Sequence, residues 1–170
     1  MDLDRTIDET DLHILALLQE NARISNAEVA RQVGLAPSAT LERMRKLEAR
    51  GLIRDYVTRI DPRPLGYGLL AFVFVRSDER IGEPETARRL AEIPQVQEVH
   101  HVAGEDCYLV KVRAADPEQL GRLLREGFGA IPSVRSTRTT IVLETVKECP
   151  RLPLPVPAAV VKAELEEVVP

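Results

Sequence analysis

The sequence predicts an α+β protein in which a winged-type helix-turn-helix of three short helices precedes a ferredoxin-like βαββαβ sandwich. Two observations support this fold class. Residues 25–53 show the apolar spacing of two helices separated by a glycine, and residues 69–146 show strand-like and helix-like segments in turn. A chain of 170 residues is long enough for two small domains.

The expected domains follow from these changes of pattern. They are a helix-turn-helix domain, a linker containing a hinge strand, a ferredoxin-like domain and a proline-rich extension, at residues 1–52, 53–67, 68–147 and 148–170.

The first helix is expected from about Asp8 to Asn21. Its apolar residues recur at three- and four-residue steps, as on the buried side of a helix: Leu12, Ile14, Leu15 and Leu18. Acidic residues cluster at its start, where the helix dipole stabilises negative charge: Asp8, Glu9 and Asp11.

The second helix is expected to begin at Ser25. Ser25 and Glu28 have capping-box spacing, so the Ser25 hydroxyl should accept from the Glu28 N–H while the Glu28 side chain reaches back to the Ser25 N–H. Gly34 lies where the chain needs a positive φ to turn, which glycine adopts without a steric penalty. The inward-facing residues are expected to be Ala27, Ala30, Val33 and Leu35.

The third helix is expected to begin at Pro37, whose missing N–H costs nothing in a first turn, and to end at Gly51. Its apolar stripe is expected to be Thr40, Leu41, Met44 and Leu47. The second helix of a helix-turn-helix lies in a DNA major groove, where its first residues meet base edges and its Arg and Lys side chains bind phosphates or guanine. The candidate DNA-binding residues are Ser38, Ala39, Thr40, Glu42, Arg43, Arg45, Lys46, Arg50 and Arg54.

The alternative interpretation of this helix is a solvated, charge-rich face with no partner. The capped helix and glycine turn before it favour DNA. The whole chain has a net charge of −4, yet residues 36–54 contain five basic side chains against two acidic ones. One basic helix on an acidic protein indicates a focused contact with double-stranded DNA rather than general polyanion binding.

The composition excludes several other classes of protein. No stretch is long and apolar enough for a membrane span, and the acidic N-terminus does not resemble a signal peptide. Cys107 and Cys149 do not make a disulfide framework, so a protein of the reducing cytoplasm is expected. No zinc-ligand spacing, phosphate-binding glycine loop or nucleophile elbow is present, so we expect no metal, cofactor or catalytic residue.

The second half has the order βαββαβ. Strands are expected at 69–76, 96–102, 107–112 and 136–146, with helices at 84–93 and 117–130. Both helices begin with Pro-Glu and are followed by Ile-Pro-x-Val, which indicates two successive βαβ units. The sheet face away from the helices is expected to expose Phe72, Phe74, Val99, Tyr108 and Val110. A second subunit would cover it most simply, so we predict a homodimer.

Several phrases, in this order, resemble the Lrp/AsnC family of bacterial and archaeal transcriptional regulators: IDETDLHILALLQENARIS, EVARQVGLAPSATLERMRKLEARGLIRDYVTRIDP, VAGEDCYLVKVRA and STRTTIVL. The resemblance extends over residues 3–147. It implies that the C-terminal domain binds a small effector, usually an amino acid, and that dimers assemble further, often into octameric rings. Ala36 stands where family members often have a capping serine, which removes about 1 kcal/mol of local stability.

The resemblance also implies an effector site. The candidate residues are the loop Val102, Ala103, Gly104, Glu105, Asp106, Cys107 and Tyr108, with Thr137 and Thr139 facing a neighbouring subunit's loop. The family usually has Asp where Cys107 stands, and Asp106 lies one residue earlier. Backbone N–H groups near Gly104 and the threonine hydroxyls would bind a carboxylate, and Glu105 or Asp106 an ammonium group. The alternative is a plain polar hairpin turn.

Two other functions remain open. One is an amino-acid sensor or assembly module that does not bind DNA. The other is an enzyme similar to the sirohaem decarboxylases, which resemble this family in fold, although the basic helix and the loop HHVAGEDCY argue against it. The prolines after Cys149 disfavour regular structure, so the extension is expected to be disordered or packed on a neighbour, with a short helix or strand at 160–168.

Overall fold

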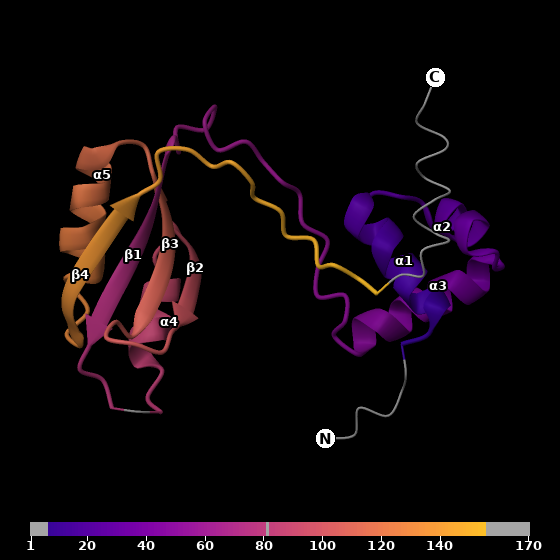
Figure 1. Cartoon of the computed structure of the whole chain (residues 1–170), viewed down its shortest axis with the longest axis horizontal. Helices are drawn as coiled ribbons and strands as arrows, with labels where there is room; N and C mark the ends of the chain where they lie inside the picture. The colour runs from indigo at the N-terminus through magenta and orange to yellow at the C-terminus, as the bar shows by residue number, and fades with distance from the viewer. Residues whose placement is uncertain (1–6, 81, 156–170) are drawn as a thin grey trace. The chain divides into compact units, whose positions relative to one another are not determined.

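The computed structural model describes residues 7–80 and 82–155 (Figure 1). Its described residues divide into two compact units. The helical unit contains the chain up to Arg59 together with the segment that begins at Cys149, and the sheet unit contains Ile60–Glu148.

Three helices form the helical unit: α1 (Glu9–Glu20), α2 (Asn26–Val33) and α3 (Pro37–Ala49). They enclose a small apolar core in which Ile14, Val29 and Leu47 are almost completely buried. The predicted three-helix arrangement is confirmed.

Local sequence signals set most of the helix ends. The Asp8 side chain accepts from the Asp11 N–H at 2.7 Å, and Ser25 Oγ accepts from the Glu28 N–H at 3.2 Å. Gly34 has the predicted positive φ, at +70°. The reciprocal arm of the capping box is wrong, because the Glu28 carboxylate instead accepts from Arg31 and Gln32 one turn further along α2.

Two predicted inward positions are also wrong. Ala27 is exposed. Val29, two residues later, lies about 200° further round the helix, and it is Val29 that faces the core. Leu41 is 38% exposed, because Thr40, one residue earlier, takes the buried position in line with Leu47.

The linker 53–67 forms no strand in the described structure, so the predicted hinge strand is wrong for a single chain. A strand needs a neighbour to pair with its N–H and C=O groups, and the four described strands pair only with one another. The apolar side chains of Val57 and Ile60 consequently stay 73% and 63% exposed.

The sheet unit confirms the predicted βαββαβ order. Its antiparallel sheet has the strand order β2-β3-β1-β4. The elements are β1 (Leu69–Ser77), α4 (Glu85–Ala91), β2 (Val96–His101), β3 (Tyr108–Ala114), α5 (Pro117–Arg122), the π-helical turn η1 (Leu123–Phe128) and β4 (Val134–Ile141).

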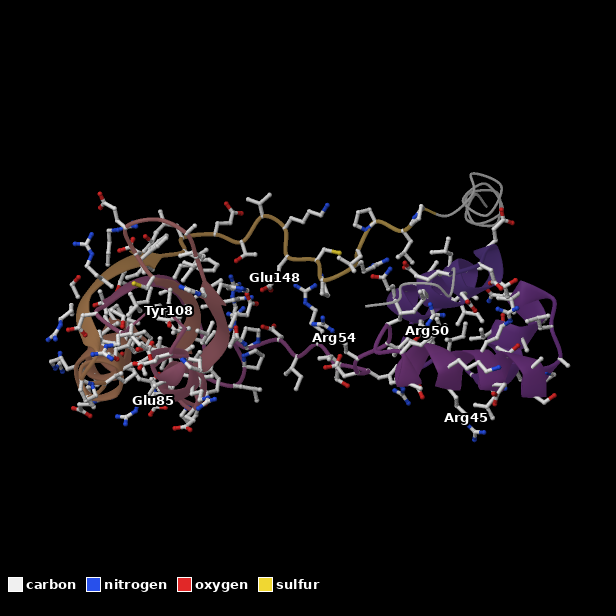
Figure 2. The ribbon with its side chains drawn as sticks, turned by 90° about the horizontal axis from the view of Figure 1, so that it is seen from below. Arg45, Arg50, Arg54, Glu85, Tyr108 and Glu148 are labelled. Carbon is white, nitrogen blue, oxygen red and sulfur yellow. The ribbon has the colours of Figure 1, made fainter. Side chains whose placement is uncertain are left out.

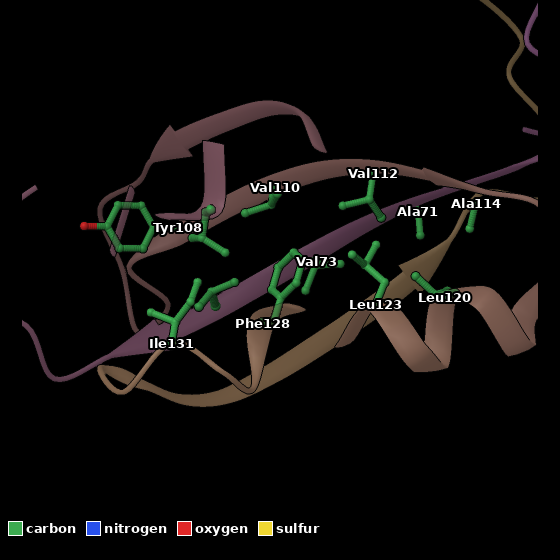
Figure 3. Close-up of a cluster of buried hydrophobic side chains, with 12 residues drawn as sticks. Ala71, Val73, Tyr108, Val110, Val112, Ala114, Leu120, Leu123, Phe128 and Ile131 are labelled. Atoms are coloured by element: carbon green, nitrogen blue, oxygen red, sulfur yellow. The ribbon is translucent and has the colours of Figure 1, made fainter. Parts of the chain in front are cut away.

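Alternation along β1 builds the core of this unit. Ala71, Val73 and Val75 are fully buried on one side of the sheet, where Leu90 of α4 and Phe128 of η1 pack against them (Figure 3). Both helices therefore cover the same face, as in a ferredoxin-like sandwich.

The opposite face of the sheet, which we call the open face, has no helix over it. Phe72 and Phe74 lie there as predicted, half-buried. Val99, Tyr108 and Val110 were assigned to this face wrongly, because the strand register sets them beside Val73 and Val75 on the helix-covered side. The directly paired residues of neighbouring strands share a face, so register decides the side.

The last strand is shorter than predicted. β4 pairs with β1 only as far as Ile141, and the following Val142 N–H donates to Leu70 O, next to the first residue of β1. Beyond that point β1 offers no partner, and Leu143 is 98% exposed. The predicted element at 160–168 lies outside the described residues.

Candidate nucleic-acid interface and effector loop

The outer side of α3 is a row of exposed polar and cationic side chains. Figure 2 labels Arg45 on this helix and Arg50 and Arg54 just after it. Seven of the nine predicted DNA-binding residues are solvent-exposed: Ser38, Ala39, Glu42, Arg45, Lys46, Arg50 and Arg54. Lys46 pairs with Glu42 at 3.4 Å, and such an exposed i,i+4 pair opens at little cost when a phosphate competes for the cation.

Thr40 cannot take the predicted role at a base edge. Its residue is fully buried, and its hydroxyl donates to the Ala36 carbonyl at 3.2 Å. The Ala36 carbonyl, which also accepts from the Thr40 N–H, thereby satisfies the buried hydroxyl.

Arg43 connects α3 to α1. Its Nη1 lies 2.7 Å from Asp8 Oδ2 and 2.8 Å from Asp11 Oδ1, and the side chain is 35% exposed. These hydrogen bonds raise the pKa of Arg43 further above its ordinary range. Arg43 therefore links α3 to α1, a structural role that the sequence-based assignment to DNA binding did not include. The acidic residues at the start of α1 are the sequence signal for this contact, in addition to their interaction with the helix dipole.

Tyr56 is a functional candidate that the sequence did not reveal. Its hydroxyl donates to Glu48 Oε1 on α3 at 2.8 Å. Burial and this bond to a carboxylate raise the pKa of Tyr56 to about 12. The contact holds the first residues of the linker against the end of α3.

We expect the helical unit to lose stability in acid partly through Asp8. The Asp11 N–H, and then Arg43, hold the pKa of Asp8 below its ordinary value of 3.8. A lowered pKa stabilises the folded state above pH 3.8, and this contribution disappears as the pH falls through the folded-state pKa. Asp8→Asn keeps a capping oxygen but cannot titrate. Thermal melts between pH 5 and pH 2.5 should therefore show a smaller loss for the variant, and an unchanged pH profile would contradict this.

The predicted effector loop, residues 102–108, consists of the turn 102–107 that joins β2 to β3 and of Tyr108, the first residue of β3. It is closed by the Val102 N–H, which donates to Cys107 O, and is bound to the end of β1 by the Cys107 N–H, which donates to Val75 O. Gly104 has φ +145°, a conformation that L side chains rarely adopt. In the described structure, no backbone carbonyl accepts from the N–H groups of residues 103–105.

Two ion pairs hold the loop to neighbouring strands. Glu105 contacts Arg76 on β1 at 3.5 Å, and Asp106 contacts Arg138 on β4 at 2.9 Å. The Arg138 guanidinium also lies 3.9 Å from the centre of the Phe74 ring, a cation–π contact. The sequence-based candidates omitted Arg76 and Arg138. Each of these arginines lies on a neighbouring strand and pairs with one of the two carboxylates of the loop.

Two of the predicted effector residues support the loop instead. Tyr108 is 5% exposed, and its hydroxyl donates to Glu79 Oε2 at 3.1 Å. Burial first, and then Glu79, raise the pKa of Tyr108 above its ordinary value. Cys107 Sγ lies 3.4 Å from both backbone polar atoms of Ser77. Their side chains are thus occupied by the fold.

Thr137 and Thr139 lie on the edge strand β4, on the helix-covered side of the sheet. They pair with Val75 and Val73, whereas Arg138 between them pairs with Phe74 on the open face. Within one chain the structure brings Asp106 to Arg138 and does not bring it to either threonine. Both threonines remain at an edge that a neighbouring subunit can approach.

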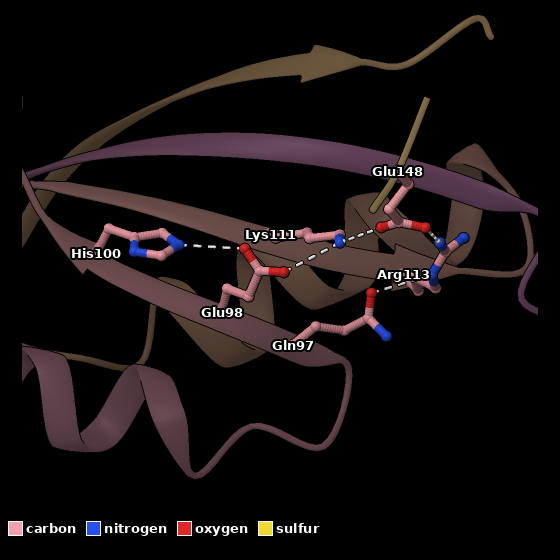
Figure 4. A network of polar contacts seen from close by, with 6 residues as sticks. All are labelled: Gln97, Glu98, His100, Lys111, Arg113 and Glu148. Atoms are coloured by element: carbon pink, nitrogen blue, oxygen red, sulfur yellow. Dashed lines mark hydrogen bonds and ion pairs between the residues drawn. The ribbon is translucent and has the colours of Figure 1, made fainter. Parts of the chain in front are cut away.

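A charged network crosses the open face (Figure 4). Lys111, whose side chain is 12% exposed, donates to Glu98 at 3.0 Å and to Glu148 at 2.5 Å, and Arg113 lies 3.9 Å from Glu148. Burial opposes the charge on Lys111, but the two carboxylates outweigh it, so its pKa is raised. His100 contacts the other oxygen of Glu98.

No described helix has the length and apolar character that a bilayer crossing requires. In the same described residues, no group of three or more His, Cys, Asp or Glu is placed to hold a metal ion.

The fold and these surfaces define a class of protein: a helix-turn-helix unit with a cationic helix face, joined to a separate ferredoxin-like unit. Family comparison agrees with both halves. Residues 7–54 match the winged helix-turn-helix DNA-binding family, and residues 70–152 match the Lrp/AsnC ligand binding domain. The chain belongs to the Lrp/AsnC family of DNA-binding transcriptional regulators, which are not enzymes.

Relatives of known identity cover most of the chain. It is 38% identical over 149 residues to the HTH-type transcriptional regulator FL11 of Pyrococcus horikoshii, covering 87% of this chain and 97% of FL11. It is 37% identical over 152 residues to the leucine-responsive regulatory protein of Escherichia coli K12, covering 87% and 92%. A Neisseria meningitidis transcriptional regulator, solved as a complex with L-Met, superposes with a TM-score of 0.82 at 30% identity, covering 88% of this chain and 98% of that one.

Proposed function

We propose that this chain recognises specific DNA sequences through α3 and that an amino acid bound at the 102–107 loop regulates this binding. The observation that supports the first part is the two-sided character of α3. Thr40 and Leu47 bury its inner side, while Arg45 and Lys46 lie exposed on its outer side. A rigid helix with one buried face and one cationic face is what major-groove recognition requires.

The position of each residue along α3 indicates which part of the DNA it would contact. Ser38, Ala39 and Glu42 lie near the N-terminal end, which meets base edges in this geometry. Arg45, Lys46, Arg50 and Arg54 lie further along and supply contacts to phosphates or guanine. In a dimer, two such helices reach successive major grooves one helical turn apart.

Selection of bound duplexes from a random pool tests sequence-specific binding. We expect enrichment of a partly palindromic site and a dissociation constant that rises steeply with salt, because phosphate contacts release counterions. Enrichment of no sequence, together with an absence of salt-dependent binding, would instead favour a sensor that does not bind DNA.

The effector we propose is a free amino acid. Its carboxylate would accept from the backbone N–H groups at 103–105 or from Arg138, and its ammonium would donate to Asp106 or Glu105. Opening the Asp106–Arg138 ion pair costs little free energy. The ammonium group of the amino acid would then pair with Asp106 in place of Arg138, and its carboxylate would pair with Arg138 in place of Asp106. The L-Met complex of the Neisseria relative supports an amino acid as the class of ligand.

Asp106→Ala should weaken amino-acid binding at least about tenfold, because the ammonium group loses a charged acceptor. Isothermal titration with a panel of L-amino acids measures this. Asp78→Ala is the matched control, since Asp78 also pairs with an arginine of β4, Arg135, outside the loop. Equal affinities in wild type and Asp106→Ala would place the ammonium site elsewhere.

The open face is the surface we propose for dimerisation. Phe72 and Phe74 supply apolar contact area, and the Lys111 network can extend across a two-fold axis to the partner's own charges. Further assembly into octamers, regulated by the effector, follows the family pattern. Light scattering with and without amino acids tests both steps, and a monomer at micromolar concentration would contradict the dimer.

We place the protein in the cytoplasm, where both cysteines stay reduced.

A further inference from the structure

The carboxyl end of α1 binds a residue from far along the chain. Gln19 Nε2 donates to the Leu152 carbonyl at 3.2 Å, and the Leu152 N–H donates to Gln19 Oε1 at 2.7 Å. One side-chain amide thus satisfies both backbone polar groups of Leu152, as a neighbouring strand would. Beside it, the Arg151 guanidinium pairs with the Glu20 carboxylate.

The sequence around Leu152 suits such docking. Pro150 and Pro153 restrict the backbone to extended conformations, so less conformational entropy is lost when the segment docks. Proline also lacks an N–H, which leaves few groups in this stretch that need other partners. The described residues from Cys149 onward accordingly group with the helical unit rather than with the sheet unit that precedes them.

We propose that the carboxyl end of α1, at Gln19 and Glu20, is a docking surface for the chain's own residues 149–152. The DNA-binding unit is then restrained at two helices. The linker contacts α3 through Tyr56 and Glu48, and the docked segment contacts α1. The proposal rests on the DNA-binding function proposed above, because its consequence is the orientation of α3.

The consequence follows from how α1 supports α3. Arg43 ties α3 to Asp8 and Asp11 of α1, so a restraint on α1 also limits the directions in which α3 points. When one DNA-binding unit of a dimer occupies its half-site, a restrained second unit has a higher effective concentration at the other half-site. Docking of residues 149–152 should therefore raise the affinity for DNA that carries two half-sites more than the affinity for DNA that carries one.

Hydrogen exchange on the full-length protein tests the contact directly. Between residues 150 and 155 only Arg151, Leu152 and Leu154 carry an N–H, so the Leu152 signal is simple to resolve. Gln19→Ala should speed Leu152 exchange at least about fivefold. Gln32→Ala is the matched control, because Gln32 on α2 bonds to Glu28 and should leave Leu152 unchanged. Unprotected exchange at Leu152 in the wild type would overturn the proposal.

Charge-reversal variants separate the loss of the Glu20–Arg151 ion pair from a general destabilisation of α1. Glu20→Arg and Arg151→Glu should each speed Leu152 exchange, and the double variant should restore protection because the pair is re-formed with opposite signs. Faster exchange in the double variant than in either single variant would overturn the ion-pair part of the contact.

Binding to DNA tests the consequence. With selected duplexes that carry one or two half-sites, Gln19→Ala combined with Arg151→Ala should lose several-fold in affinity for the paired site and nothing for the single site. Equal losses on both duplexes would overturn the orienting role. If wild type binds neither duplex, the proposed function fails, while the exchange experiment still decides whether the segment docks.

Discussion

Leu47→Ala should unfold the helical unit or bring it close to unfolding, and should abolish DNA binding with it. Leu47 is 1% exposed and joins α3 to the core residues of α1 and α2. Truncating a buried leucine costs about 2–5 kcal/mol, and a unit of this size has little more stability than that. The measurement is a thermal melt in which the transition of the helical unit moves to much lower temperature.

Leu41→Ala provides the matched control on the same helix. Leu41 is 38% exposed, so its truncation should cost well under half as much and leave DNA binding in place. Equal destabilisation by the two variants would mean that the sequence-based stripe, which treated Leu41 and Leu47 alike, was correct and that the packing described above is not.

The contrast between these two leucines shows what the sequence could and could not predict. Helix ends depend on a few adjacent residues, so the cap at Ser25 and the turn at Gly34 were predicted from spacing alone, whereas Asp8 was assigned only to the helix dipole and proved to be a cap. Which of two adjacent stripe residues is buried depends on the angle at which α3 meets α1 and α2. Periodicity leaves that angle open, and Thr40 therefore appeared both in the core and among the DNA-binding residues.

The candidate effector loop illustrates a second limit. That a glycine-containing turn joins β2 to β3 was predictable from the sequence around Gly104. The partner of Asp106 was not, because Arg138 lies on β4 and reaches the loop only once the register sets it opposite Phe74. A shift of one residue would have brought a threonine there instead. The contact of Leu152 with Gln19, 133 residues apart, has no local signal at all.

Arg45→Ala should lower DNA affinity about tenfold at physiological salt without changing the stability of the helical unit. Arg45 is exposed on the outer side of α3, and no ion pair is found for it in the described structure. Removing one cation that contacts a phosphate or guanine costs about 1–3 kcal/mol, and loss of a phosphate contact reduces the salt slope of binding by about one.

Arg43→Ala should show the opposite pattern, a loss of stability with a smaller loss of DNA affinity. It leaves Asp11, only 7% exposed, without its cation, so the unit should lose about 1–2 kcal/mol. This is less than for a fully buried pair, because Arg43 itself is about one-third exposed. Affinity measured at low temperature, where the variant is still folded, should then fall less than for Arg45→Ala. Titrations paired with thermal melts separate the two effects. A stable Arg43→Ala protein that no longer binds DNA would return Arg43 to the DNA-contacting surface, since the ion pairs with α1 would then be dispensable for folding.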